Sequence, residues 1–381
     1  MFLENSYDAS MRKNTSGSRP DRVAGALRVE IGTLEPGDKL PGMHKLRQRF
    51  GVSITTISAA LDILASEGLV DRRRGSGVYA SDRAGCKRIG ILSELNLFDP
   101  RIGPHWRSLA GELKTALEAA GYIPHLYVGN ADPGPDASDE PTCPRFWEDA
   151  GAGRLDGAVI LDVPSTGAWQ ARVWNCPIPV TGSLTPYTVM QDFSAITSAA
   201  VARLAEQGCR RLGFIAWHGE AAFVEAVKNH GLATCEEWVR TRLDPATRGA
   251  GWEEFRDIWS ARSGHPDGLV ILDDMLFADA QLAMFELGVR VPEDLRLAVL
   301  TSRDASPPLR LPLTAFEIEP AQLAAELAGL LRQRLAGELA APVTRYLPFR
   351  EVAVQPDEGG RSFQLREVCE DRVGRKMKAK D

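Results

Sequence analysis

Three arginines beside two glycines form the cluster with the clearest chemistry in this chain. They occupy the run Arg72-Arg73-Arg74-Gly75-Ser76-Gly77. Guanidinium groups bind phosphate oxygens, and glycine allows bare backbone to approach a nucleic acid closely. An isolated arginine triplet is more often a solvated hairpin, so its surroundings decide between the two readings.

Short polar side chains lie upstream of this cluster, at positions suited to DNA. Hydroxyl and imidazole groups can hydrogen-bond phosphates or base edges. We therefore predict DNA contacts from His44, Lys45, Ser53, Thr55, Thr56, Ser58, Arg72, Arg73, Arg74, Gly75 and Gly77.

The elements that must hold these residues are two helices and a strand pair. Pro41-Gly42 breaks the chain before the first helix, in which Leu46 and Phe50 share an apolar face. Gly51 ends that helix, and Ser53 is placed as the N-cap of the next. The second helix has a buried stripe of Ile57, Ala60, Leu61 and Leu64. A strand from Leu69-Val70 then leads to the arginine tip, and Val78-Tyr79-Ala80 returns.

Residues 34–80 resemble the winged helix-turn-helix of the GntR family of bacterial regulators. The resemblance rests on the turn PGDKLP at 36–41, GVSITT at 51–56, Ala60-Leu61, EGLV at 67–70 and the wing 73–77. It implies that the second helix enters the DNA major groove. It also implies that the arginine cluster forms the wing and contacts DNA.

The DNA-reading surface departs from the family pattern. Gly42-Met43-His44 stands where the family has Ser-Glu-Arg, and Ile54 and Ser58 stand where it has arginine. The bidentate arginine–guanine contact is therefore not available from these positions. We expect the wing and the phosphate contacts to supply a large share of affinity. Base readout would then rest on His44, Thr55, Thr56 and Ser58.

Charge is divided unevenly along the chain. The 381 residues carry a net charge of −6. Residues 12–83 hold 13 Lys/Arg against 8 Asp/Glu, which leaves −11 for the remainder. A basic end on an acidic body is expected when one domain binds DNA and the other does not.

The six cysteines (Cys86, Cys143, Cys176, Cys209, Cys235 and Cys369) show no CxxC spacing. We therefore expect reduced thiols in a cytoplasmic protein, with no structural zinc and no cofactor. The chain has no apolar run of membrane-spanning length and no signal-peptide core, so no membrane partner is expected.

The predicted organisation has five segments. A disordered N-terminus covers 1–18, a winged helix-turn-helix 19–80, a linker 81–87, an effector-binding and dimerisation domain 88–354, and a flexible tail 355–381. Within the tail, Arg375–Lys378 is read as a solvated end rather than a second DNA patch.

Residues 88–354 alternate between short apolar strands and amphipathic helices, which predicts an α/β body with parallel sheets covered on both faces. About ten strands are too many for one simple doubly wound sheet, so two lobes are expected. Of these strands, the ones placed individually are 88–92, 123–128, 156–161, 178–182, 211–217, 268–272 and 295–300; the predicted helices are 105–121, 196–207, 220–230 and 279–287; and 231–264 is less regular.

The order of these elements is similar to the LacI/GalR-type effector domain, which has the type I periplasmic-binding-protein fold. The longest matching segments are Arg88–Leu92, Leu155–Ile160, Leu204–Ile215 and Leu287–Asp294. The resemblance implies two lobes joined by three crossings, which we place near 192–194, 314–318 and 345. It also implies a dimer and a small-molecule effector between the lobes.

Open α/β sheets bind ligands at the carboxyl ends of their strands. The residues there are Ser93, Glu94, Trp106, Asp162, Trp217, His218, Asp273, Asp274, Thr301 and Arg303. An indole beside carboxylates suits a sugar or a sugar derivative. Two alternatives stay open: Asp274 as a helix cap only, and Trp106 as core packing.

Two polar anchors of the family's sugar site are missing. Gly219 stands at the position of an arginine, and Val299 to Ser302 replace a G-[FY]-D-D turn. Either Arg303 and Asp304 substitute for them, or the effector is not an ordinary free sugar, or the cleft has lost ligand binding.

These observations predict a dimeric, ligand-responsive regulator, more specifically a repressor of a carbohydrate or small-metabolite operon. The chain is not expected to be an enzyme, because hydrolase, P-loop, zinc-protease and dinucleotide motifs are absent. A pyridoxal-dependent enzyme fused to the head is one alternative, although only Lys114 and Lys228 occur between Gly90 and Arg375. A DNA-binding protein with an inert body is the other.

Overall fold

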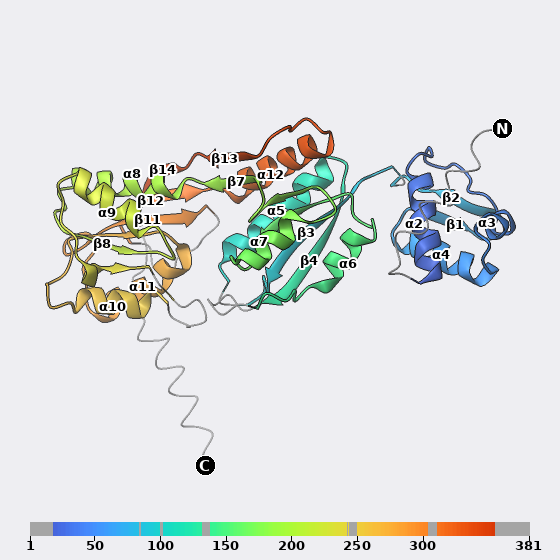
Figure 1. Ribbon diagram of the computed structural model, residues 1–381. Helices are drawn as coiled ribbons and strands as arrows, with labels where there is room; N and C mark the ends of the chain where they lie inside the picture. The colour runs from blue at the N-terminus through green and yellow to red at the C-terminus, as the bar shows by residue number, and fades with distance from the viewer. Residues whose placement is uncertain are drawn as a thin grey trace, which may run out of the picture.

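The computed structural model describes residues 18–354 apart from 84, 100–101, 132–137, 242, 244–249 and 304–310. A small N-terminal head and two larger lobes follow one another in a row (Figure 1). The predictions for 1–17, for the tail from 355 onward and for Asp304 lie outside the described residues. Ser18, predicted to belong to the disordered N-terminus, instead caps the first helix of the head.

The head contains three helices and a two-stranded antiparallel wing. Its elements are α2 (Arg19–Ile31), α3 (Met43–Phe50), α4 (Ile54–Ser66), β1 (Val70–Arg73) and β2 (Gly77–Ala80). The predicted details of the head are confirmed: Gly51 ends α3 in the left-handed conformation, Ser53 caps α4, and α4 buries the predicted stripe. Sequence reasoning did not identify α2, which packs Leu27 and Ile31 into the same core.

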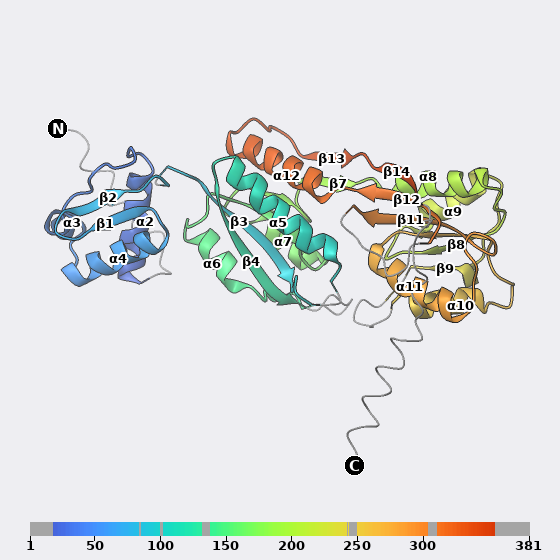
Figure 2. The same cartoon turned by 180° about the vertical axis from the view of Figure 1, so that it is seen from behind.

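Lobe 1 is built on a four-stranded parallel sheet in the order β4–β3–β5–β6. Its strands are β3 (Arg88–Leu95), β4 (Ile123–Ala131), β5 (Gly157–Asp162) and β6 (Val180–Gly182), and its helices are α5 (Pro104–Ala119), α6 (Pro144–Gly151), α7 (Gly167–Trp174) and α12 (Pro320–Leu335). Leucines of α5 and α12 bury one face of the sheet, while Phe146 of α6 and Trp169 of α7 bury the other. Figure 2 shows α12 lying beside α5.

Lobe 2 is built on a six-stranded sheet in the order β14–β12–β11–β10–β8–β9, parallel except for β14 at its edge. Its strands are β8 (Leu212–Ile215), β9 (Val239–Arg240), β10 (Gly268–Ile271), β11 (Arg296–Ser302), β12 (Leu313–Ile318) and β14 (Arg350–Val354). Its helices are α8 (Phe193–Glu206), α9 (Glu220–Asn229), the short η1 (Glu236–Trp238), α10 (Trp252–Trp259) and α11 (Asp274–Glu286).

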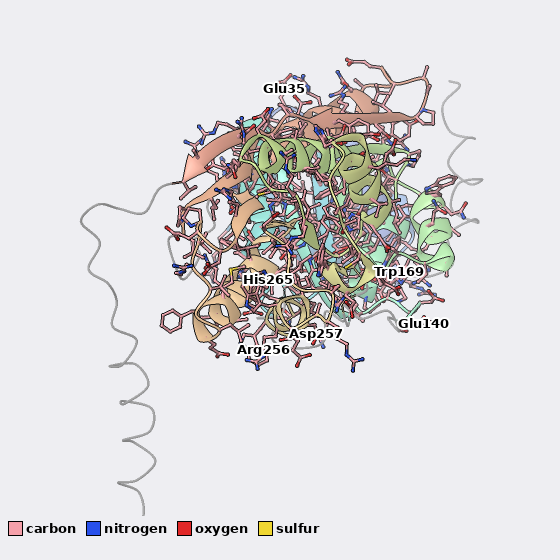
Figure 3. The ribbon with its side chains drawn as sticks, turned by 90° about the vertical axis from the view of Figure 1, so that its left-hand side faces the viewer. Glu35, Glu140, Trp169, Arg256, Asp257 and His265 are labelled. Carbon is pink, nitrogen blue, oxygen red and sulfur yellow. The ribbon has the colours of Figure 1, made fainter. Side chains whose placement is uncertain are left out.

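Helices cover both faces of the lobe 2 sheet, as continuous apolar strands require. The pair α8 and α9 covers one face, and α10 and α11 cover the other. At the outer surface of α10, Arg256 and Asp257 point away from the body (Figure 3). The described residues therefore confirm the predicted α/β class with two lobes and parallel sheets.

The chain passes between the lobes at three places. The paired strands β7 (Tyr187–Gln191) and β13 (Val343–Leu347) lead into lobe 2 at α8 and β14, and β12 leads back to α12 in lobe 1. The crossing predicted near 192–194 is confirmed. The crossing predicted near 345 is also confirmed, because 345 lies in β13, one of the strands that run between the lobes. The crossing predicted near 314–318 falls on β12, and the chain leaves lobe 2 just after it, before α12 begins at Pro320.

Two further predictions differ from the structure. Helix α11 begins at Asp274 rather than at 279, because Asp273 accepts hydrogen bonds from the backbone of Met275 and Leu276 and so caps it. The stretch 231–264, predicted as less regular, contains α10, which buries Phe255 and Ile258. Among the described residues, no helix is long and apolar enough to cross a membrane.

A charged network joins the head to lobe 1. Glu67, at the end of α4, accepts hydrogen bonds from Nε of Arg28 at 2.9 Å and from a terminal nitrogen of Arg88 at 3.2 Å. The Arg88 backbone N–H also donates to Asp156 at 2.7 Å. Arg28 and Arg88 are 8% and 7% exposed, so this one carboxylate serves buried cations from two domains.

Candidate nucleic-acid interface and ligand cleft

The wing presents its arginines from a tight turn. Arg73 pairs with Gly77 in the β1–β2 register, so Arg74, Gly75 and Ser76 form the turn. Gly75 has a φ of +74° and Gly77 a φ of +133°, a region that favours glycine. The exposed Arg74 therefore stands at the outermost point of the wing.

The three arginines are not equivalent. Arg72 makes an ion pair with Asp62 of α4, and a terminal nitrogen lies 3.4 Å from Ser58 Oγ. The Arg73 guanidinium lies 4.5 Å from the centre of the Tyr79 ring. Arg74 has no ion pair among the described residues, which leaves its charge available to a phosphate.

The start of α4 gathers the predicted hydroxyl groups. Ser53 Oγ accepts from the Thr56 backbone N–H at 3.1 Å and lies 2.7 Å from Thr55 Oγ1 and 2.8 Å from Thr56 Oγ1. On α3, His44 and Lys45 are exposed. The exposed surface of the head thus carries hydroxyl, imidazole, ammonium and guanidinium groups, a set suited to phosphates and base edges.

A cleft of about 800 Å³ lies between the lobes, large enough for a small organic molecule. Seven of the ten predicted effector residues line it: Trp106, Asp162, Trp217, His218, Asp273, Asp274 and Thr301. Trp106 also packs against the lobe 1 core, which is one of the two roles considered from the sequence, and its contact with a ligand stays a prediction.

Ser93, Glu94 and Arg303 are corrections, because none of them lines the cleft. Glu94 is fully buried in lobe 1 and accepts hydrogen bonds from the Trp147 indole and from the backbone at Thr142. Ser93 Oγ donates to a backbone carbonyl two residues on. Arg303 instead pairs with Glu319 at 2.6 Å. A strand end thus indicates the right edge of the sheet but not the direction of each side chain.

The adjacent aspartates at the start of α11 have different roles. Asp273 is the helix cap, while Oδ2 of Asp274 is buried and has no hydrogen-bond partner among the described residues. The cap of α11 is therefore Asp273, while Asp274 lines the cleft, and its contact with a ligand stays a prediction.

Burial perturbs the ionisable groups of the cleft. It raises the pKa of Asp162 to about 7, and with the neighbouring charge of Asp273 it raises the pKa of Asp274 to about 6. Burial also raises the pKa of Asp273 and lowers that of His105 to about 4. Each shift reflects the cost of a charge with little water around it.

Several cleft residues were not predicted. His105 Nδ1, at the start of α5, lies 2.9 Å from Ser302 Oγ at the end of β11, so this contact bridges the two lobes. Gln191 ends β7, and Tyr346 lies on β13. Gln191 and Tyr346 lie on the two strands that run between the lobes. These strands were not among those predicted from the sequence, so their residues were not considered.

The backbone conformation explains why glycine stands where the family's sugar site has an arginine. Gly219 caps α9 in the left-handed conformation, with a φ of +102°. An arginine there would be strained, so the local backbone suits glycine. Among the described residues, no three His, Cys, Asp or Glu side chains are grouped to hold a metal. Lys114 and Lys228 are both exposed on helices, and neither lines the cleft.

Two family models match the chain. Residues 20–80 match "Bacterial regulatory proteins, gntR family", and residues 201–354 match "Periplasmic binding protein-like domain". The first match covers the head and the second covers lobe 2 and the returning elements. The resemblances stated for both parts are thereby confirmed.

Relatives of known function are regulators. The arabinose metabolism transcriptional repressor of Halalkalibacterium halodurans is 21% identical over 322 residues, which span 79% of this chain and 84% of that protein. The Uxu operon transcriptional regulator of Escherichia coli is 33% identical over 78 residues, 20% of this chain and 30% of that protein.

Solved structures share the fold. The complex of the transcriptional regulator CelR with cellobiose is 19% identical, with a TM-score of 0.59 over 89% of this chain and 98% of that one. A LacI-type regulator from Bacillus cereus is 17% identical, with a TM-score of 0.58 over 72% of this chain and 100% of that one.

Proposed function

We propose that this ligand-responsive transcription regulator is a cytoplasmic, dimeric repressor. It joins a GntR-family DNA-binding head to a periplasmic binding protein-like body, and its affinity for operator DNA depends on whether the inter-lobe cleft holds an effector. The observation that carries the proposal is the combination of an exposed wing arginine on the head with an 800 Å³ cleft in the body of the same chain. An effector that favours one lobe arrangement shifts the population toward it.

The DNA-binding residues of this proposal are those of the wing and of the α3–α4 surface. Arg74 and Arg73 would contact phosphates, and Thr55, Thr56 and Ser58 would face bases or phosphates at the start of α4. Two heads in a dimer would then read a two-fold symmetric operator, as paired helix-turn-helix proteins do.

Effector binding would use the groups that meet in the cleft. The relatives include an arabinose repressor and the mannosyl-D-glycerate system repressor of Escherichia coli, which favours control of a carbohydrate or small-metabolite operon. The contact of His105 with Ser302 joins the two lobes and would form or break as they close or open.

The test is salt-dependent binding of the purified full-length protein to DNA upstream of its own gene, compared with random DNA of equal length. We expect a preference of at least about a thousandfold at moderate salt. Equal affinity for both DNAs would refute the operator-binding function. The oligomeric state, measured by light scattering with and without DNA, tests the dimer.

A further inference from the structure

The inter-lobe cleft has an unusual balance of charge. Asp162 approaches it from lobe 1, and Asp273 and Asp274 approach it from lobe 2. None of the described residues that line it is a lysine or an arginine. The described lining therefore carries three aspartates, and its only titratable nitrogen groups are the imidazoles of His105 and His218.

Two buried acceptors in this cleft lack donors. Oδ2 of Asp274 has no hydrogen-bond partner among the described residues, and neither has Oε1 of Gln191, a residue that is only 6% exposed. Buried acceptors without a partner are costly, so a ligand that supplies donors relieves both. Because Gln191 ends a strand of the lobe connection, this acceptor is independent of the aspartates.

The rest of the wall is mainly apolar, with hydroxyl side chains interspersed. The apolar residues beside the aspartates include Leu161, Leu184, Val189, Leu272, Leu300 and Ile318. A ligand covered with hydroxyl groups would press several of them against these side chains without partners. A ligand with one group of hydrogen-bond donors on an apolar framework would satisfy the acceptors and also pack against the apolar side chains.

We propose that the effector is an amine: a protonated amino group carried on an apolar or aromatic framework. This inference rests on the proposed function of the cleft as the effector site. The ammonium group would lie between Asp162 and Asp274, with its framework against the aliphatic wall and the Trp106 and Trp217 indoles, whose faces attract cations. Acids and phosphorylated sugars would meet these carboxylates and, among the described lining residues, no lysine or arginine.

The expected protonation states agree with this geometry. Burial raises the pKa of Asp162 to about 7 and that of Asp274 to about 6, so in the empty cleft each carries its charge at a cost. A bound cation repays that cost, whereas a bound anion increases it.

The experiment uses matched sets of compounds that differ in one functional group. The first set is tryptamine, tryptophol and indole-3-acetate; the second is 2-phenylethylamine, 2-phenylethanol and phenylacetate. Affinity is measured by calorimetry on the full-length protein, and release of promoter DNA is measured in parallel. We expect the amine of at least one set to bind about tenfold or more tightly than its neutral partner, and the acid not to bind.

Variants then locate the cation. D274N and D162N, on opposite lobes, should each lower amine affinity by about tenfold and change that of the neutral compound far less. D257N, on the outer face of α10, is the matched control and should change neither (Figure 3). Circular dichroism and thermal unfolding report that the body of each variant is folded, and the second aspartate keeps the test valid should one variant misfold.

A neutral or acidic compound that binds best and releases DNA would overturn the amine while leaving the regulator intact. No binding by either set, with DNA binding normal, would overturn both the amine and the role of the cleft. An amine advantage that survives in both aspartate variants would also overturn the inference.

Discussion

The wing arginines provide the sharpest quantitative test of how the head grips DNA. The change is Arg74→Ala, compared with Arg72→Ala. Arg74 is exposed at the turn with no ion pair among the described residues, whereas Arg72 is already paired with Asp62. Arg72 would have to give up that pair to reach a phosphate, and Arg74 would not.

The magnitude follows from counterion release. Each lost phosphate contact reduces the slope of log affinity against log salt by about 0.9, so two heads of a dimer lose about 1.8 in Arg74→Ala. The ratio of wild-type to variant affinity should therefore be roughly tenfold smaller at 200 mM salt than at 50 mM salt. For Arg72→Ala we expect a change well below one unit per head.

The assay is fluorescence anisotropy of labelled promoter and random DNA over a salt series. Arg290→Ala is the control, because Arg290 lies in lobe 2 and pairs with Asp294. An unchanged slope in Arg74→Ala would refute the wing as a phosphate clamp. Equal changes in Arg74→Ala and Arg72→Ala would refute the role assigned to the Asp62 pair.

Two further outcomes are expected. Glu67→Gln leaves buried Arg88 without its carboxylate partner in the head, although Asp156 remains beside it. The free energy of unfolding, measured with denaturant, should therefore fall by about 2 kcal/mol; wild-type stability would contradict the network. His105→Asn removes a group whose pKa burial between the lobes lowers to about 4, and which would return toward about 6.5 if the lobes separated. Wild-type closure should therefore weaken, relative to the variant, as pH falls below about 6.5. The difference is measured as the distance between labels on the two lobes. Asp162 and Asp274 titrate with the opposite sign, and comparing wild type with the variant at equal pH removes their contribution. Identical pH profiles of the two proteins would exclude a role of His105 in closure.

The head was largely predictable from the sequence because its signals are local. Pro41-Gly42, Gly51 and Ser53 act within one turn of their own position, and the structure places each helix boundary where they indicate. Helix α2 was missed because its signals, Ser18 and a first-turn Pro20, lie in a polar stretch that resembles a disordered end.

The cleft was predictable only to the level of the sheet edge. Strand ends correctly indicated Asp162 and Asp273, but a strand residue can face either side of its sheet. Glu94 therefore points into lobe 1, where the Trp147 indole and backbone N–H groups partner it. His105 and Ser302 belong to different lobes, and a contact between lobes leaves no signal in either local sequence.

The carboxylate of Glu67 has a consequence for how such proteins can be recombined. It completes the head by holding Arg28 and completes the junction by holding Arg88. A foreign head grafted at the linker would keep its own fold yet leave Arg88 with Asp156 of the body as its carboxylate partner and without the one from the head. A chimera that keeps the junction must therefore supply a carboxylate at the position of Glu67.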